Sequence, residues 1–239
     1  MPRAISHANM PRGEGRRKTE RMLKLLTGAY GRPRQRRAGA AVDVLVATIL
    51  SQNTSGANSS AGFESLKRHF GSWDAAADAP VAAIERCIRV SGLSRRKAPR
   101  IRNILRQIRA ETGRVSLDFL RARRAQEAYD YLVRFDGVGP KTALCVLMFS
   151  FNVPVFPVDT HVYRICSRLG LLGSRTPGAR AHEVLGPMIA PGNRQAMHLL
   201  LIAHGRRTCR ARRPACRSCC LLGLCRFAKR RAERKGKGA

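Results

Sequence analysis

Residues 135–143 read FDGVGPKTA and place a tight turn between two helical segments. Residues 126–134 before the turn have a helical pattern, and a nearly continuous apolar run begins at Leu144 after it. Gly137 and Gly139 permit the turn, and they bring backbone N–H groups to the surface where the second helix starts. These donors and the helix dipole favour a phosphate, and Pro140 suits a first helical position. The stretch therefore predicts a helical hairpin that can bind an anion.

Helical patterns extend from this hairpin through the interior of the chain. Apolar residues recur at i, i+3, i+4 and i+7 in residues 101–108 and 162–169, which gives each segment one apolar face. Residues 44–50 and 144–151 are almost entirely apolar, so periodicity alone cannot assign them, but their length and neighbours favour buried helices over strands. No Asn-Gly or Asp-Gly turn joins two alternating runs. The sequence predicts an all-α fold.

The charge of the chain points to a polyanionic partner. Its 46 basic residues face only 15 acidic ones, for a formal net charge of +31. Nucleic acid is the expected partner, although charge alone also fits a well-solvated Arg-rich surface and does not separate DNA from RNA or an anionic membrane surface. No run of about 18 apolar residues predicts a membrane span, and residues 1–17 lack the apolar core of a secretory signal. We expect a soluble, non-secreted, cytoplasmic protein if the source is prokaryotic.

One lysine stands out from an arginine-rich background. Of the 46 basic residues 38 are arginine, and Lys141 is the only lysine between Ala98 and Ala228. Arginine stays protonated in proteins and cannot attack as an amine, whereas lysine can lose its proton near positive charge or on burial. Arginine supplies the other positive charges of this stretch, so a lysine at this position is a candidate nucleophile.

Five of the eight cysteines crowd into residues 209–225, and four of them have the spacing C-x6-C-x2-C-x5-C. A zinc site would more often show two C-x2-C pairs, and a disulfide framework is disfavoured without a secretory signal. Four thiolates on one short loop suit a [4Fe-4S] cluster. The expected ligands are Cys209, Cys216, Cys219 and Cys225, with Cys220 as a non-ligand. The scattered Cys87, Cys145 and Cys166 are expected to be buried free thiols.

These motifs together resemble the helix-hairpin-helix glycosylases of DNA repair. Residues 135–143 resemble the signature L-P-G-V-G-x-K-T-A, residues 156–161 resemble a V-D-T-H segment, and the cysteine spacing resembles the iron-sulfur loop of the endonuclease III and adenine glycosylase branches. The resemblance covers about residues 18–227. It implies two helical domains flanking an active-site cleft.

The resemblance also implies where the domains lie. A central helical barrel with the hairpin would span residues 41–152, and an iron-sulfur cluster domain would combine residues 18–40 with 153–227. Residues 1–17 and 228–239 are polar and basic, without apolar periodicity, and are predicted to be disordered tails. We expect a monomer.

The family's catalytic pair is a lysine on the second hairpin helix and an aspartate about eighteen positions downstream, which the resemblance assigns to Lys141 and Asp159. An amine that attacks the glycosidic carbon forms an imine, and the imine allows strand cleavage by β-elimination. This implies a bifunctional glycosylase and AP lyase of base excision repair that acts on oxidised pyrimidines or abasic sites in duplex DNA. Without the family, Asp159 would be interpreted as a helix N-cap. The alternatives are a DNA-binding homologue with weak or lost activity and a monofunctional mismatch glycosylase.

Base removal from a duplex requires the nucleotide to leave the stack. Residues 49–54, ILSQNT, resemble the family's L-S-x-Q-x-T segment with a register shift, so either Gln52 or Asn53 could be the polar wedge. Residues 91–98 resemble G-L-x-x-x-K-A and make Leu93 the apolar wedge. Without the family, these residues would be polar helix caps and a core leucine.

Further DNA contacts are expected along the hairpin and the cysteine loop. Asp136 stands where the hairpin signature has proline and places a negative charge near the expected phosphate. The full set of candidate DNA-binding residues is Gly137, Val138, Gly139, Gln52, Asn53, Leu93, Arg210, Arg212 and Arg213.

Overall fold

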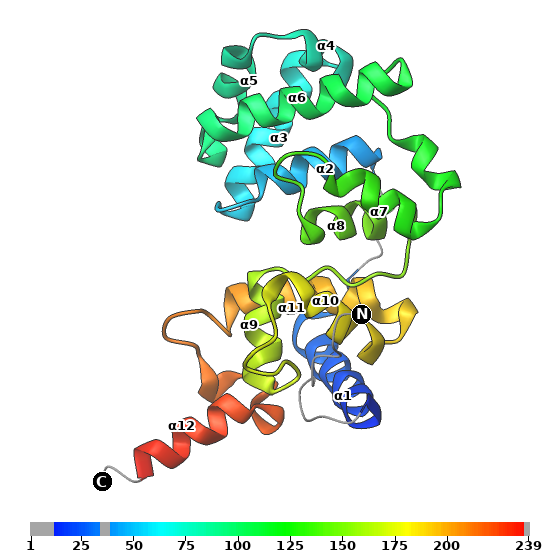
Figure 1. Ribbon diagram of the computed structural model, residues 1–239. Coiled ribbons are helices and arrows are strands. Elements are labelled where there is room, and N and C mark those ends of the chain that lie inside the picture. Colours follow the sequence, from blue (N-terminus) through cyan, green and yellow to red (C-terminus); the bar gives the residue numbers. More distant parts are fainter. Residues whose placement is uncertain (1–11, 34–38, 237–239) are drawn as a thin grey trace. The chain divides into compact units, whose positions relative to one another are not determined.

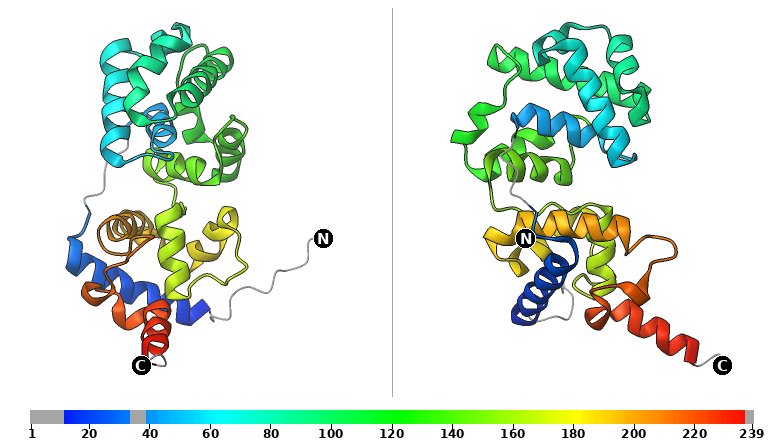
Figure 2. Two further views of the ribbon diagram at one scale, coloured as in Figure 1. Left: turned by 90° about the vertical axis from the view of Figure 1, so that its left-hand side faces the viewer. Right: turned by 180° about the vertical axis from the view of Figure 1, so that it is seen from behind.

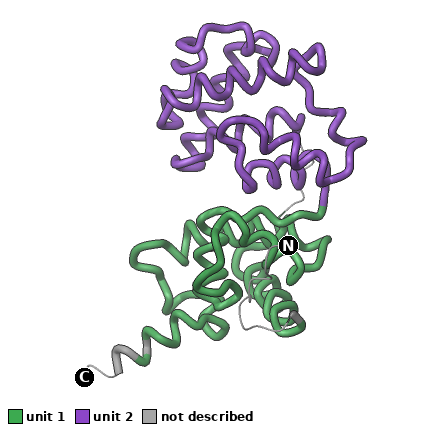
Figure 3. Tube along the Cα trace, in the orientation of Figure 1, with its two compact units in different colours: residues 1–35, 154–239 green, residues 36–153 purple. Residues whose placement is uncertain are grey.

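The computed structural model describes residues 12–33 and 39–236, and these residues form helices and loops without a β-strand. The predicted all-α class is confirmed. The chain divides into two compact units, one of residues 1–35 and 154–239 and the other of residues 36–153 (Figure 3). We call the first of these unit 1 and the second unit 2. No helix in the described residues is both long and apolar enough to cross a membrane.

Unit 2 is built from a set of short helices and one long one (Figure 1). Helix α2 packs against α3 and α8, and α6 packs against α4 and α5 (Figure 2). The helices are α2 (Ala41–Leu50), α3 (Gly56–Phe70), α4 (Trp73–Asp78), α5 (Val81–Ile88), α6 (Ser94–Thr112), α7 (Ala125–Val133) and α8 (Pro140–Phe151), with 3₁₀ turns η1 (Arg89–Ser91) and η2 (Asp118–Ala122).

The apolar runs of the sequence form the centre of unit 2. Seven of the ten residues of α2 and eight of the twelve residues of α8 are buried, which explains why neither run shows amphipathic periodicity. Both predicted helices are confirmed. In α6 the predicted stripe of Ile101, Ile104, Leu105 and Ile108 is buried, while the rest of the helix carries charge.

Unit 1 joins the two ends of the chain around one core. Met22 and Leu26 of α1 pack with Val162 and Ile165 of α9 in a single apolar cluster. Helix α11 contacts both α1 and α9. The elements are α1 (Arg12–Tyr30), α9 (Thr160–Leu169), η3 (Gly178–Arg180), α10 (Ala181–Leu185), η4 (Gly186–Met188), η5 (Pro191–Asn193), α11 (Arg194–Arg207), η6 (Cys216–Ser218), η7 (Leu222–Leu224) and α12 (Arg226–Gly236).

Both predicted tails contain helix, which corrects part of the expectation. Helix α1 begins at Arg12 and is held by the Thr19 hydroxyl, which donates to the Met188 carbonyl at 2.5 Å. Helix α12 continues to Gly236, and its Ala, Lys and Arg residues have high helix propensity. Residues 1–11 and 237–239 of the predicted tails lie outside the described residues.

Candidate active site and cysteine loop

The hairpin of unit 2 forms as the glycines predict. After α7 the Val138 N–H donates to the Phe135 carbonyl at 3.0 Å, and Gly137 has φ +75°, a conformation that strains other residues. Pro140 is the first residue of α8, and the Gly139 carbonyl accepts from the Thr142 N–H at 3.0 Å. Val138 is only 3% exposed, so its side chain offers little surface for the expected DNA contact.

Lys141 is the second residue of α8 and is half-buried. It therefore follows the turn directly, at the end of the helix where the N–H groups are free of intrahelical partners and the dipole is positive. Such a position favours an anion beside the amine. A half-buried lysine remains accessible to a substrate while part of its charge is shielded from water.

The loop after α2 differs between its two candidate wedge residues. The Gln52 side chain donates from Nε2 to the Gly137 carbonyl at 3.2 Å and so ties this loop to the hairpin. Asn53 is exposed and has φ +53°. Neither residue is the C-cap of α2, which is Ser51.

Leu93 is 47% exposed and has φ +51°, which excludes the alternative of an ordinary core leucine. Val90 nearby is equally exposed at 47%. Single exposed apolar residues are common on protein surfaces, but a leucine in the left-handed region is not. The loop from η1 into α6 therefore presents an apolar side chain in a strained conformation.

In unit 1 Asp159 is the N-cap of α9, and its Oδ1 accepts from the Val162 N–H at 2.8 Å. Its second carboxylate oxygen makes no hydrogen bond to another described residue. The N-cap function inferred without the family is thus present, and it leaves one oxygen free for other chemistry. Lys141 belongs to unit 2 and Asp159 to unit 1.

The N-terminal turn of α9 is linked to the start of the cysteine loop through Arg164. Its guanidinium donates to the carbonyls of Cys209 at 3.0 Å and Gly205 at 3.1 Å, and its Nη2 lies 3.0 Å from Nδ1 of His161. Burial lowers the pKa of His161, and Arg164 adds to this effect. The neutral imidazole is therefore favoured as the partner of Arg164.

The four predicted ligand cysteines line one small cavity. Arg168 closes it on one side and donates from Nη1 to the Cys209 Sγ at 3.1 Å. The Cys219 Sγ lies 3.5 Å from Nε2 of His204, and burial lowers the pKa of this histidine to about 4, so its ring is neutral. The cavity is lined by Arg168, Thr208, Cys209, Pro214, Ala215, Cys216, Cys219, Leu222, Cys225, Phe227 and Ala228, and Cys220 is not among them.

The four cysteine sulfurs that line one cavity are a donor set that fits a four-iron cluster. Among the described residues no three His, Cys, Asp or Glu side chains converge closely enough to hold one metal ion. Each thiolate of a [4Fe-4S] cluster binds its own iron, so the four sulfurs need to surround a space and not a point. Burial raises the pKa of the Cys219 thiol to about 11, and a bound metal cation would favour its thiolate.

Two residues near the cysteines have no counterpart in the sequence interpretation. Arg168 and His204 contact the sulfurs of Cys209 and Cys219, but they lie in other helices, and no local pattern marks them. The three remaining cysteines differ from one another. Cys145 and Cys166 are buried as predicted, whereas Cys87 of α5 is only half-buried, which corrects the expectation for this thiol.

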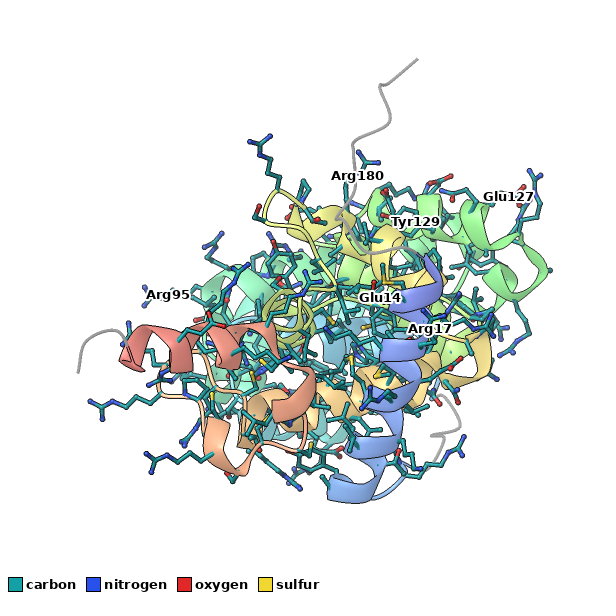
Figure 4. All side chains as sticks on the ribbon, turned by 90° about the horizontal axis from the view of Figure 1, so that it is seen from below. Glu14, Arg17, Arg95, Glu127, Tyr129 and Arg180 are labelled. Carbon is teal, nitrogen blue, oxygen red and sulfur yellow. The ribbon has the colours of Figure 1, made fainter. Side chains whose placement is uncertain are left out.

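Basic side chains are exposed on each unit. Arg210, Arg212 and Arg213 of the cysteine loop are all exposed, and Arg213 has φ +49°. Of two arginines labelled in Figure 4, Arg95 of unit 2 has a side chain that is 93% exposed, and Arg180 of unit 1 is half-exposed and pairs with Glu183. Because these side chains lie on the surface, they can contact phosphates without disturbing the packing of either core.

Comparison with known proteins gives consistent matches. Residues 46–187 match the HhH-GPD superfamily of base excision DNA repair proteins. Endonuclease III of Sulfolobus acidocaldarius is 35% identical over 185 residues, which are 77% of this chain and 80% of that protein. A putative DNA glycosylase of Arabidopsis thaliana is 40% identical over 165 residues, or 69% of this chain, and the chain spans only 56% of that longer protein. The solved structure of a trapped endonuclease III–DNA covalent intermediate matches with a TM-score of 0.77 and 27% identity, over 91% of this chain and 98% of that one.

Proposed function

Because the chain belongs to the HhH-GPD superfamily and to its endonuclease III family of base excision repair glycosylases, we propose that it is a bifunctional glycosylase and AP lyase. Its proposed substrates are duplex DNA with an oxidised pyrimidine or an abasic site. The observation that carries the proposal is Lys141, an accessible amine at the start of α8 and the only lysine between Ala98 and Ala228. A glycosylase that only hydrolyses the bond has no need of an amine at this place.

The proposed reaction uses Lys141 as the nucleophile. The neutral Nζ attacks C1′ of the damaged nucleotide, the bond from C1′ to the base breaks, and the base leaves with a proton. The C1′–O4′ bond then opens, O4′ takes up a proton, and the amine and C1′ become an imine, which makes the C2′ proton acidic. Loss of this proton and departure of the 3′ phosphate then break the strand by β-elimination. Hydrolysis of the imine returns free Lys141.

Asp159 is the proposed carboxylate partner in this reaction. It is the only carboxylate between Gly137 and His182, and its N-cap hydrogen bond uses one oxygen and fixes the orientation of the other. A carboxylate held in this way can stabilise the positive charge that develops on the sugar, and it can accept a proton. The trapped covalent intermediate of the related endonuclease III supports a covalent step for this chain as well.

The cysteine loop is the proposed site of a [4Fe-4S] cluster held by Cys209, Cys216, Cys219 and Cys225. A bound cluster would supply four metal-thiolate bonds that order this loop, whose own contacts are mainly turns. The Arg168 side chain donates to the Cys209 sulfur, and Nε2 of His204 lies 3.5 Å from the Cys219 sulfur. The ordered loop then presents Arg210, Arg212 and Arg213 to DNA phosphates. Breaking a glycosidic bond requires no redox step.

Borohydride trapping tests the proposal directly. Full-length protein should form a covalent adduct with duplexes that contain an abasic site or an oxidised pyrimidine, because borohydride reduces the imine to a stable amine. Lys141→Gln should abolish the adduct and retain DNA binding, and Lys24→Gln, which changes an exposed lysine of α1, should trap like the wild type. DNA binding without any adduct would support the weak or inactive homologue instead. Base release without an adduct would support a monofunctional glycosylase.

A further inference from the structure

We propose that Lys97 is a positioning residue that holds the two loops used for base expulsion in a fixed relation, an inference that rests on the proposed function. Lys97 lies in the first turns of α6 and is 2% exposed. Its ammonium donates to the carbonyls of Leu50 at 2.8 Å and Ser91 at 3.0 Å. One buried cation thus joins two segments that are 41 residues apart in the sequence.

Each of the two carbonyls belongs to a residue that lies two or three positions before a candidate wedge residue. Leu50 is the last residue of α2 and precedes Gln52 and Asn53, and Ser91 ends η1 and precedes Gly92 and Leu93. All of these residues belong to unit 2, so the relation is set within one compact body. The ammonium also caps the carbonyl end of α2, where a positive charge is favourable.

Positive φ marks both loops at a candidate wedge residue. Asn53 and Leu93 are two of the four described non-glycine residues with positive φ, at +53° and +51°. Such conformations persist where the surrounding structure holds them, and they cluster at functional sites. Leu93 is also half-exposed, so burial of its side chain does not offset the strain.

The anchor on the Ser91 side is rigid. Ser91 is fully buried, and its hydroxyl donates to the Asn58 carbonyl of α3 at 3.3 Å. A Cβ atom on Gly62 of the same helix would overlap this hydroxyl, so the glycine provides the space for close packing. Lys97 therefore connects the loop after α2 to Ser91, whose position is fixed by its contacts with α3.

Stability alone gives a weak reason for a lysine at this position. Burial lowers the pKa of Lys97, and within the described residues its hydrogen bonds go to carbonyl oxygens and no carboxylate pairs with it. A buried charge without a counter-ion is a poor source of stability, and an apolar side chain of similar length would fill the same volume. The ammonium contributes two directional bonds that an apolar chain cannot make.

Two reactions of the proposed enzyme, base excision and abasic-site cleavage, distinguish a positioning function of Lys97 from a general effect on stability. Removal of a damaged base requires both wedges to enter the duplex as the nucleotide leaves the stack. A preformed abasic site has no base to expel, so cleavage there depends on Lys141 and much less on the wedges. Loss of Lys97 should therefore slow base excision more than abasic-site cleavage.

The test compares Lys97→Met with wild type as full-length, iron-loaded protein on these two duplexes. Under single-turnover conditions excision of an oxidised pyrimidine should fall about tenfold to a hundredfold, as for a misplaced catalytic contact, and abasic-site cleavage should fall less than about threefold. Fluorescence of 2-aminopurine beside the lesion should show reduced unstacking on binding. Lys67→Met, which removes a half-exposed lysine paired with Asp43 in the same unit, should leave all three readings near wild type.

Lys97→Gln keeps a neutral donor of shorter reach and provides a second variant if methionine impairs folding. Equal loss on both duplexes together with a lower melting temperature, or no loss on either, would overturn the inference. If wild-type protein cuts neither duplex, the proposed function fails. The aminopurine signal in the bound complex still decides on Lys97 in that case, because it reports base unstacking and not bond cleavage.

Discussion

Arg100 donates from Nε to Oδ2 of Asp136 at 3.0 Å and thereby pairs the carboxylate that stands in the hairpin where the family signature has proline. The Asp136 side chain is 85% exposed and that of Arg100 is 21% exposed. The negative charge that the sequence places near the expected phosphate is therefore compensated by a residue of α6. Neither Nη atom of Arg100 donates to another described residue.

Arg100→Gln should weaken binding to duplex DNA by about fivefold to tenfold, because it removes a cation and leaves Asp136 unpaired beside a phosphate. The loss should shrink as salt is raised. Binding measured by fluorescence anisotropy at several salt concentrations tests this, with Arg100→Gln/Asp136→Pro as the matched variant. The double variant should recover much of the affinity at low salt. An unchanged affinity for Arg100→Gln would contradict a contribution of this pair to DNA binding.

Gly137→Ala should destabilise unit 2 by about 1–3 kcal/mol, because a non-glycine residue at φ +75° is strained and its Cβ would overlap Arg100. Gly139→Ala provides the matched control in the same turn. Gly139 has φ −87°, and a Cβ there would meet nothing within 4 Å. Thermal unfolding of both variants should show a lower melting temperature for Gly137→Ala only. Equal melting temperatures would show that the hairpin tolerates a side chain at residue 137.

The cysteine assignments predict a sharp difference between neighbouring residues. Serine in place of Cys209, Cys216, Cys219 or Cys225 should remove iron and the broad visible absorption of the cluster, because each thiolate binds one iron. Cys220→Ser should retain about four irons per chain, since Cys220 does not line the cavity. Iron and zinc analysis of purified protein measures both outcomes. Stoichiometric zinc without iron in the wild type would refute the cluster.

Local sequence patterns were sufficient for those parts of the molecule whose cause is local. The glycines of the hairpin specify its turn, and the length and neighbours of the two apolar runs favoured the buried helices α2 and α8. The Asp159 N-cap follows from the Asp-Thr start of α9. Cysteine spacing marked the loop because its four candidate ligands lie within seventeen residues.

Contacts between distant residues could not be predicted in this way. Arg100 is 36 residues from Asp136, and no pattern in either segment points to the other. The same holds for Lys97 and Leu50, which are 47 residues apart. It also holds for Thr19 and Met188, whose hydrogen bond helps to fix α1 just after the predicted tail of residues 1–17. Positive φ at Asn53 and Leu93 is also set by tertiary packing, because neither residue type requires it.

Leu93→Ala should separate catalysis from stability because the leucine is half-exposed. Its removal takes little apolar area out of the core and leaves the melting temperature near that of the wild type. Excision of an oxidised pyrimidine should fall about tenfold or more, since the gap left by the departing base is no longer filled. Leu105→Ala in α6 removes a fully buried leucine and should cost about 2–5 kcal/mol of stability without a selective effect on excision. Calorimetry and single-turnover excision on the same preparations distinguish the two variants. Wild-type excision by Leu93→Ala would exclude this residue as a wedge.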